Sequence, residues 1–312
     1  MVTALTALGL IIGLVLGSFV KALSDRSLKN KSFWGRSYCP HCKHSLRWYD
    51  LFPVFSYLIL KGKCRYCHKK IGIEYLLVEV AMGILIAFLF YQFLTNVFAR
   101  SPDFIGTTWQ SFLLNFPIVQ TVFDLFLNTF FITILAVLTI TDLKETLIPD
   151  RIVVPSILIS FISLLVFTVY KIGYLYWYLN QSVLGKLLLP PHSDYFYRHS
   201  LYSAQPLLGG ILTGLGIGGF FLALIIVTKG RGMGGGDVKL GAFMGLILGF
   251  PNGVLATILG FLTGAVVALV LIVSGRKKFG ENIPFGPFLV LGSLITLFWG
   301  SQIIDWYLKL SR

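Results

Sequence analysis

The chain has 312 residues, of which 56% are hydrophobic and 12% are charged. Soluble domains typically carry about 25% charged residues, so this composition excludes an ordinary water-soluble globule and indicates a protein surrounded by lipid. The 26 Lys and Arg residues outnumber the 13 Asp and Glu residues and give a net charge of +13. In a soluble protein this excess would suggest nucleic acid, whereas in a membrane protein it reports the side on which each loop lies. We therefore expect membrane lipid, and no nucleic acid, among the partners.

Eight apolar segments are candidates for membrane helices, because a helix needs roughly 20 apolar residues to cross the hydrocarbon core. They cover residues 3–23, 75–95, 118–141, 152–172, 207–228, 238–250, 253–274 and 285–307. The sixth is short and lies between a glycine-rich stretch and Pro251, so seven or nine spans also remain possible. The sequence predicts an all-α polytopic membrane protein with about eight transmembrane helices.

The distribution of basic residues predicts the orientation. With the N-terminus outside and eight spans, the inner loops hold 19 Lys and Arg residues and the outer segments hold 6, as the excess of basic residues in cytoplasmic loops requires. We divide the chain into a first transmembrane helix (1–23), a cytoplasmic region (24–74) and a transmembrane domain (75–312). An extracytoplasmic loop at about 173–206 is rich in aromatic and apolar residues, which suggests a position along the membrane interface.

All four cysteines lie in the cytoplasmic region, as two Cys-x-x-Cys pairs separated by 21 residues: Cys39, Cys42, Cys64 and Cys67. This spacing is typical of four thiolates around one tetrahedral zinc ion. A four-sulfur site has no open coordination position, so its zinc would be structural. Reduced free thiols or a redox pair are the alternative, and three nearby histidines could replace a cysteine as ligand: His41, His44 and His68.

Two aspartates border predicted membrane helices. Asp142 ends the third span, and Asp237 joins a glycine-rich stretch to the sixth span. Two carboxylates brought together in a low-dielectric site share one proton, so one can act as a base towards water and the other as an acid towards a carbonyl. This is the arrangement of an aspartyl protease, and flanking glycines would let an extended substrate approach Asp237 closely.

Each carboxylate also has a structural interpretation. Asp237 can cap the N-terminus of its helix, Asp142 can pair with Lys144 or Arg151, and Asp150 fits an N-cap of the fourth helix. A transporter or channel that uses the aspartates as an ion or proton relay is an alternative function, and Asp124 in the third span is the residue that favours it. A membrane-anchored zinc module without catalysis is a further alternative.

Taken together, the motifs resemble the bacterial prepilin peptidase family, also called type IV leader peptidases. The resemblance rests on Gly17-Ser18-Phe19, Ser24-Asp25-Arg26, Arg36-Ser-Tyr-Cys39-Pro-His-Cys42, Pro53-Val54, Lys61-Gly62-Lys63-Cys64 and Tyr75-Leu-Leu-Val-Glu79, and on Asp142 with Ile148-Pro149-Asp150 and Gly234-Gly-Gly-Asp237-Val-Lys239-Leu240. The first six motifs look like that family's cytoplasmic methyltransferase region, and the last two look like its peptidase motifs.

The resemblance implies a bifunctional enzyme of the bacterial inner (plasma) membrane. Such an enzyme cleaves the leader of type IV prepilins or pseudopilins after a glycine and then methylates the new N-terminal amine with S-adenosylmethionine. It implies that Asp142 and Asp237 are the catalytic aspartates, on the cytoplasmic side, and that the four cysteines hold structural zinc. A peptidase without methyltransferase activity is the alternative within the family.

Three features depart from the resemblance or extend it. The two aspartates are 95 residues apart, a longer separation than we expect for the family, and the 173–206 loop supplies the excess. Glu74 stands where we expect a basic or neutral residue. No motif identifies the S-adenosylmethionine pocket, for which Glu79, Gly62 and Lys63 are only candidates.

Overall fold

The computed structural model describes residues 2–29, 31–33, 35–100, 110–230, 233–276, 278 and 283–310. Within these ranges the regular structure is helical and no strand forms, as the sequence predicted. Arg231, Gly232, Lys277 and Arg312, which entered the charge count or the glycine-rich motif, lie outside the described residues. The chain forms two compact units, Met1–Leu147 and Ile148–Arg312.

Seven helices of the described residues are long and apolar enough to cross a membrane, so the protein is an integral membrane protein. They are Val2–Leu28, Ile73–Phe93, Val119–Glu145, Asp150–Leu179, Tyr195–Val227, Asn252–Val273 and Gly286–Leu310. The predicted span 238–250 corresponds to α8 (Gly235–Leu248), which has 14 residues. At 1.5 Å per residue it is about 21 Å long, which is less than the roughly 30 Å of a hydrocarbon core.

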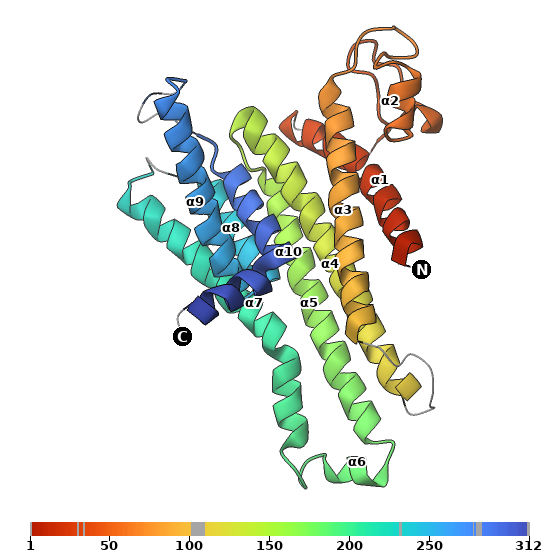
Figure 1. Cartoon of the computed structure of the whole chain (residues 1–312), viewed down its shortest axis with the longest axis vertical. Coiled ribbons are helices and arrows are strands. Elements are labelled where there is room, and N and C mark those ends of the chain that lie inside the picture. Colours follow the sequence, from red (N-terminus) through yellow and green to blue (C-terminus); the bar gives the residue numbers. More distant parts are fainter. Residues whose placement is uncertain are drawn as a thin grey trace. The chain divides into compact units, whose positions relative to one another are not determined.

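The first unit consists of three long helices and the cysteine region. Helix α1 (Val2–Leu28) lies beside α3 (Ile73–Arg100) and also contacts α4 (Gln110–Glu145). Between α1 and α3 the chain forms a short 3-10 helix, η1 (Trp48–Leu51), and α2 (Phe55–Ile59). Figure 1 shows this cysteine region as a compact group of loops and short helices at one end of α3.

Glycines allow α1 and α3 to approach closely. A Cβ atom at Gly13 would lie 2.5 Å from the carbonyl oxygen of Met82, and one at Gly17 would lie 2.6 Å from the Cα of Glu79. Small residues at such positions let membrane helices pack backbone against backbone. This contact brings the C-terminal part of α1 next to the start of α3, where the polar residues of the unit gather.

The second unit contains α5 (Asp150–Leu179), α6 (Val183–Leu187), α7 (Tyr195–Val227), α8, α9 (Asn252–Val273) and α10 (Gly286–Leu310). Helix α7 packs on α8, and α9 packs on α10. The stripe Gly210, Gly214 and Gly218 faces α8, where added Cβ atoms at the first two positions would lie 2.3 Å and 2.8 Å from carbonyl oxygens. Small residues at these positions let α7 and α8 pack backbone against backbone.

The segment 173–206 is largely helical. Helix α5 continues to Leu179, α6 follows, and α7 begins at Tyr195, so only short turns connect these elements. Aromatic rings succeed one another along the end of α5, where Tyr170, Tyr174 and Trp177 are in ring contact. The position of this segment along a membrane interface stays a prediction.

Candidate functional site: a four-cysteine cluster, a polar cavity and two buried aspartates

The four cysteines come together as predicted. Their Sγ atoms all lie within 4.8 Å of one another, and those of Cys39 and Cys67 are 3.9 Å apart. A tetrahedral zinc ion with Zn–S bonds of about 2.3 Å separates its sulfurs by about 3.8 Å. A disulfide would require about 2.05 Å, and all four cysteines are free. The cluster therefore fits a tetrathiolate metal site and does not fit a disulfide pair.

The two Cys-x-x-Cys segments share one backbone pattern. The carbonyl of Cys39 accepts from Lys43 and its N–H donates to the carbonyl of His44; Cys64 does the same with His68 and Lys69. In both segments the fourth residue after the first cysteine has a left-handed backbone, with φ of +56° at Lys43 and +54° at His68. This tight turn points both sulfurs of each segment toward one place, which explains why the spacing alone predicted the cluster.

The thiols differ in acidity. Burial raises the pKa of Cys39, but the backbone N–H groups of Cys42 and His41 outweigh this effect, so its pKa falls to about 7. At Cys67 the backbone of Lys69 lowers the pKa, yet desolvation and the neighbouring thiols raise it to about 11. None of the three histidines is needed to complete a set of four donors. His44 instead lies against Tyr66, with ring centroids 3.7 Å apart and ring planes inclined by 37°.

Asp50 of η1 ties this short helix to the second Cys-x-x-Cys segment. Its carboxylate accepts from Arg65 Nε at 2.7 Å, from the Tyr66 hydroxyl at 3.1 Å and from the backbone N–H of Arg47 at 3.2 Å. Burial opposes ionisation of Asp50, but these donors outweigh it and lower its pKa below the ordinary value. Because Arg47 and two residues of the second segment hold the charged form, the cysteine region gains stability from an ionised Asp50.

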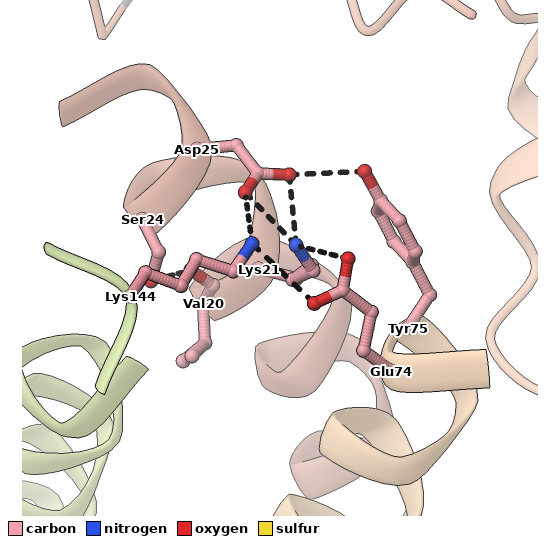
Figure 2. A network of polar contacts seen from close by, with 7 residues as sticks. All are labelled: Val20, Lys21, Ser24, Asp25, Glu74, Tyr75 and Lys144. Carbon is pink, nitrogen blue, oxygen red and sulfur yellow. Dashed lines mark hydrogen bonds and ion pairs between the residues drawn. The ribbon is translucent and has the colours of Figure 1, made fainter. Parts of the chain in front are cut away.

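A second polar group joins the three long helices of the first unit, as Figure 2 shows. Lys21 of α1 is buried, with 1% of its surface exposed, and its ammonium binds Asp25 at 2.8 Å and Glu74 at 3.4 Å. Lys144 of α4 binds the same two carboxylates, at 3.1 Å and 3.4 Å. The hydroxyl of Tyr75 donates to Asp25 at 2.9 Å. We call Lys21, Asp25, Glu74 and Lys144 the four-charge network.

The network lines a cavity of about 550 Å³ within the first unit. Residues of α1, α2, α3 and α4 line it, and so do Cys39 and Cys64 of the cluster. Of the three residues that the sequence suggested for a methyl-donor pocket, Glu79 lines the cavity, whereas Gly62 and Lys63 are not among the lining residues. Glu79 accepts a hydrogen bond from the N–H of Val54 at 2.8 Å, so it also holds the cysteine region on α3.

Asp142 lies near the end of α4, is 5% exposed, and its carbonyl accepts from the N–H of Thr146. The sequence offered Lys144 as a structural partner for Asp142, but the ion pairs of Lys144 go to Asp25 and Glu74. Asp124, on which the relay alternative depends, accepts two hydrogen bonds from the amide of Gln120 within the same helix.

Asp237 lies in the first turn of α8 and is 8% exposed. Its carboxylate accepts from the N–H of Gly234 at 3.3 Å, so the capping role that the sequence offered is present. Ile148 packs on Gly236, where a Cβ would lie 2.8 Å from the Ile148 Cβ. The predicted N-cap role of Asp150 is wrong, because Pro149 is the N-cap and Asp150 is the first residue of α5, where it binds Lys239 of α8. Asp142 belongs to the first unit and Asp237 to the second.

These features define a polytopic helical membrane protein with a four-cysteine cluster between its first two long helices and a buried aspartate in each of its two units. Two family models match the chain: the bacterial peptidase A24 N-terminal domain over residues 11–93, and the type IV leader peptidase family over residues 129–269. The chain belongs to the type IV leader peptidase family, and it is an enzyme of the peptidase and methyltransferase class.

Its relatives include three proteins called prepilin leader peptidase/N-methyltransferase. The one from Bacillus subtilis is 28% identical, over 96% of this chain and 97% of its own length. The one from Pseudomonas aeruginosa is 30% identical over 88% of this chain and 74% of its own, and that from Stutzerimonas stutzeri is 27% identical over 90% and 77%. No solved structure matches the chain significantly.

Proposed function

We propose that this protein cleaves the leader peptide of prepilins or pseudopilins after a glycine, and then N-methylates the new N-terminus with S-adenosylmethionine. The observation that carries the peptidase half is the burial of Asp142 and Asp237 at helix ends, inside the residues that the leader peptidase model matches. Buried carboxylates in a membrane protein are costly and mark functional sites.

The proposed chemistry joins the two aspartates as a dyad that shares one proton. The ionised carboxylate removes a proton from a water molecule, whose oxygen attacks the scissile carbonyl carbon, while the protonated carboxyl donates to the carbonyl oxygen. The C–N bond then breaks, and the leaving amine takes a proton from the dyad. The N–H of Gly234 holds the Asp237 carboxylate at the start of α8, which fixes its orientation before substrate binds.

The proposed topology has eight crossings, with α8 as the short one, an extracytoplasmic N-terminus and the dyad on the cytoplasmic side. The charge distribution supports this orientation, because cytoplasmic loops carry most Lys and Arg residues. A prepilin would then keep its basic leader in the cytoplasm and its apolar segment in the bilayer, so the bond between them would meet the dyad at the membrane boundary.

The second proposed activity belongs to the first unit. When bound, S-adenosylmethionine supplies a methyl group: the lone pair of the substrate amine forms the new N–C bond, the S–C bond breaks, and sulfur keeps its electron pair as a thioether. The four cysteines would hold a structural zinc ion, since four sulfur ligands leave no open position for chemistry. Zinc would thereby fix the cluster residues Cys39 and Cys64 that line the cavity.

The dyad is tested by cleavage of a prepilin peptide with the purified full chain in lipid nanodiscs. Asp142→Asn and Asp237→Asn keep the side-chain size but remove the charge, and each should lower the cleavage rate by about 10²-fold or more. Asp305→Asn is the matched control, because Asp305 is an exposed aspartate of α10, and it should cleave like wild type. Wild-type cleavage by either of the first two variants would show that the dyad assignment is wrong.

A further inference from the structure

The cavity of the first unit has the size and the lining of a binding site for a small polar ligand. Its volume of about 550 Å³ lies within the roughly 300–1,000 Å³ of pockets that take small molecules and cofactors. Charged side chains from three helices converge on one part of its wall (Figure 2). The leader peptidase model begins at residue 129, after α1 and α3, so most of this wall lies outside the matched peptidase region.

The four-charge network selects the chemistry of a ligand. It contains two ammonium groups and two carboxylates, all within 3.4 Å of an opposite charge, so it is neutral as a whole. A ligand that is only an anion or only a cation would leave one charge of the network without a partner, which is costly away from water. A zwitterion offers one group of each sign and preserves the balance.

Several other charges of the lining have partners. Arg65 binds Asp50, Arg26 donates to the carbonyls of Phe33 and Gly35, and Glu79 accepts from Val54. The wall also includes aromatic rings, which provide flat faces on which a purine can stack. They are Tyr38, His41, Tyr57 and Tyr75.

We propose that this cavity binds S-adenosylmethionine, with the four-charge network holding the ammonium and carboxylate of its methionine end and the aromatic wall receiving its adenosine. Lys21 and Lys144 bind the ligand carboxylate, and Asp25 and Glu74 bind its ammonium. The proposal rests on the methyltransferase half of the proposed function and assigns that half to particular residues. It also assigns a role to Glu74, because this acidic residue supplies the second carboxylate of the network.

Two ligands that undergo no reaction test the two ends of S-adenosylmethionine separately. S-Adenosylhomocysteine keeps the amino-acid end and cannot transfer a methyl group, whereas methylthioadenosine keeps the adenosine and lacks the amino-acid end. Isothermal titration measures both affinities for the full chain in nanodiscs. Asp25→Asn and Glu74→Gln should each weaken S-adenosylhomocysteine by about tenfold or more, the effect of losing a hydrogen bond to a charged group, and leave methylthioadenosine within twofold of wild type.

Asp305→Asn is the control and should bind both ligands like wild type. Zinc content reports whether the cysteine region is folded, and Glu74→Gln guards against misfolding because its side chain is half exposed. Equal weakening of both ligands, or unchanged binding of S-adenosylhomocysteine by both variants, would overturn the placement of the methionine end while leaving the proposed function intact. A wild-type chain that neither binds S-adenosylhomocysteine nor methylates a cleaved peptide would instead refute the methyltransferase half.

Discussion

The close contact between α7 and α8 makes a sharp prediction at two adjacent glycines. An added Cβ at Gly210 would lie 2.3 Å from the carbonyl oxygen of Leu246, whereas one at Gly209 has no atom within 4 Å. Carbon and carbonyl oxygen ordinarily approach to about 3.3–3.6 Å, so Gly210→Ala must push α8 away by about 1 Å. Gly209→Ala requires no movement.

The difference between the two variants isolates the packing cost. Both replace glycine by alanine inside one helix, so the gain in helix propensity of about 1 kcal/mol applies to both and cancels. Overpacking of a well-packed contact costs about 1–3 kcal/mol. We therefore expect Gly210→Ala to unfold with a free energy about 1–3 kcal/mol lower than Gly209→Ala. Because α8 begins at Gly235 and carries Asp237, Gly210→Ala should also cleave prepilin peptide more slowly.

Unfolding in mixed micelles, titrated with a denaturing detergent and followed by tryptophan fluorescence, measures this difference. Gly209→Ala is the reference rather than wild type, since it carries the same chemical change. Equal unfolding free energies for the two alanine variants would refute the backbone contact at Gly210. The same result would also remove our explanation for the glycine stripe of α7.

Three further predictions concern the cysteine region. Elemental analysis should find about one zinc ion per chain, lost in Cys39→Ser and Cys64→Ser; a folded wild-type protein without metal would contradict the cluster. The left-handed backbone at residue 68 disfavours alanine relative to glycine by about 1 kcal/mol. In a chelator competition His68→Gly should therefore retain zinc about fivefold more tightly than His68→Ala. Equal retention would contradict the left-handed conformation at this position. The pKa of Asp50 is lowered in the folded protein, so its contribution to stability is complete above the unfolded pKa of about 3.9 and is lost as pH falls through the folded pKa. The difference in melting temperature between wild type and Asp50→Asn should therefore be full at pH 6 and vanish toward pH 2. A difference that does not depend on pH would contradict the assigned interactions.

Features that depend on local sequence were predictable. Hydropathy located the long helices, because a span requires only a sufficient run of apolar residues. The cysteine spacing predicted the cluster, because the hydrogen bonds that close each Cys-x-x-Cys turn lie within seven residues of the chain. The short helix α8 was harder to predict. Its 14 residues are apolar like those of a membrane span, but the glycines and the proline around it set its length.

The four-charge network could not be predicted, because Lys144 and Asp25 are 119 positions apart in the chain. Only the packing of α1, α3 and α4 brings their side chains together. Two signals were nevertheless present: Lys21 stands four residues before Asp25 at the end of an apolar segment, and Glu74 stands where a basic or neutral residue was expected. The ion pairs of Glu74 with Lys21 and Lys144 explain that departure.

The exposure of each side chain in the four-charge network indicates how strong its ion pairs are, and therefore which of them a ligand can replace. Lys21 is buried and is stable there because it is paired, since an unpaired buried charge is costly. Glu74 and Lys144 are about 51% and 34% exposed, and ion pairs at such exposure contribute only about 0–1 kcal/mol. The pair of Lys21 and Asp25 is therefore rigid, whereas the ion pair between Glu74 and Lys144 can break at a small cost in free energy. A pocket for a zwitterion needs both properties: a rigid pair that sets the position of the ligand, and a loosely held pair whose charges become available when it enters.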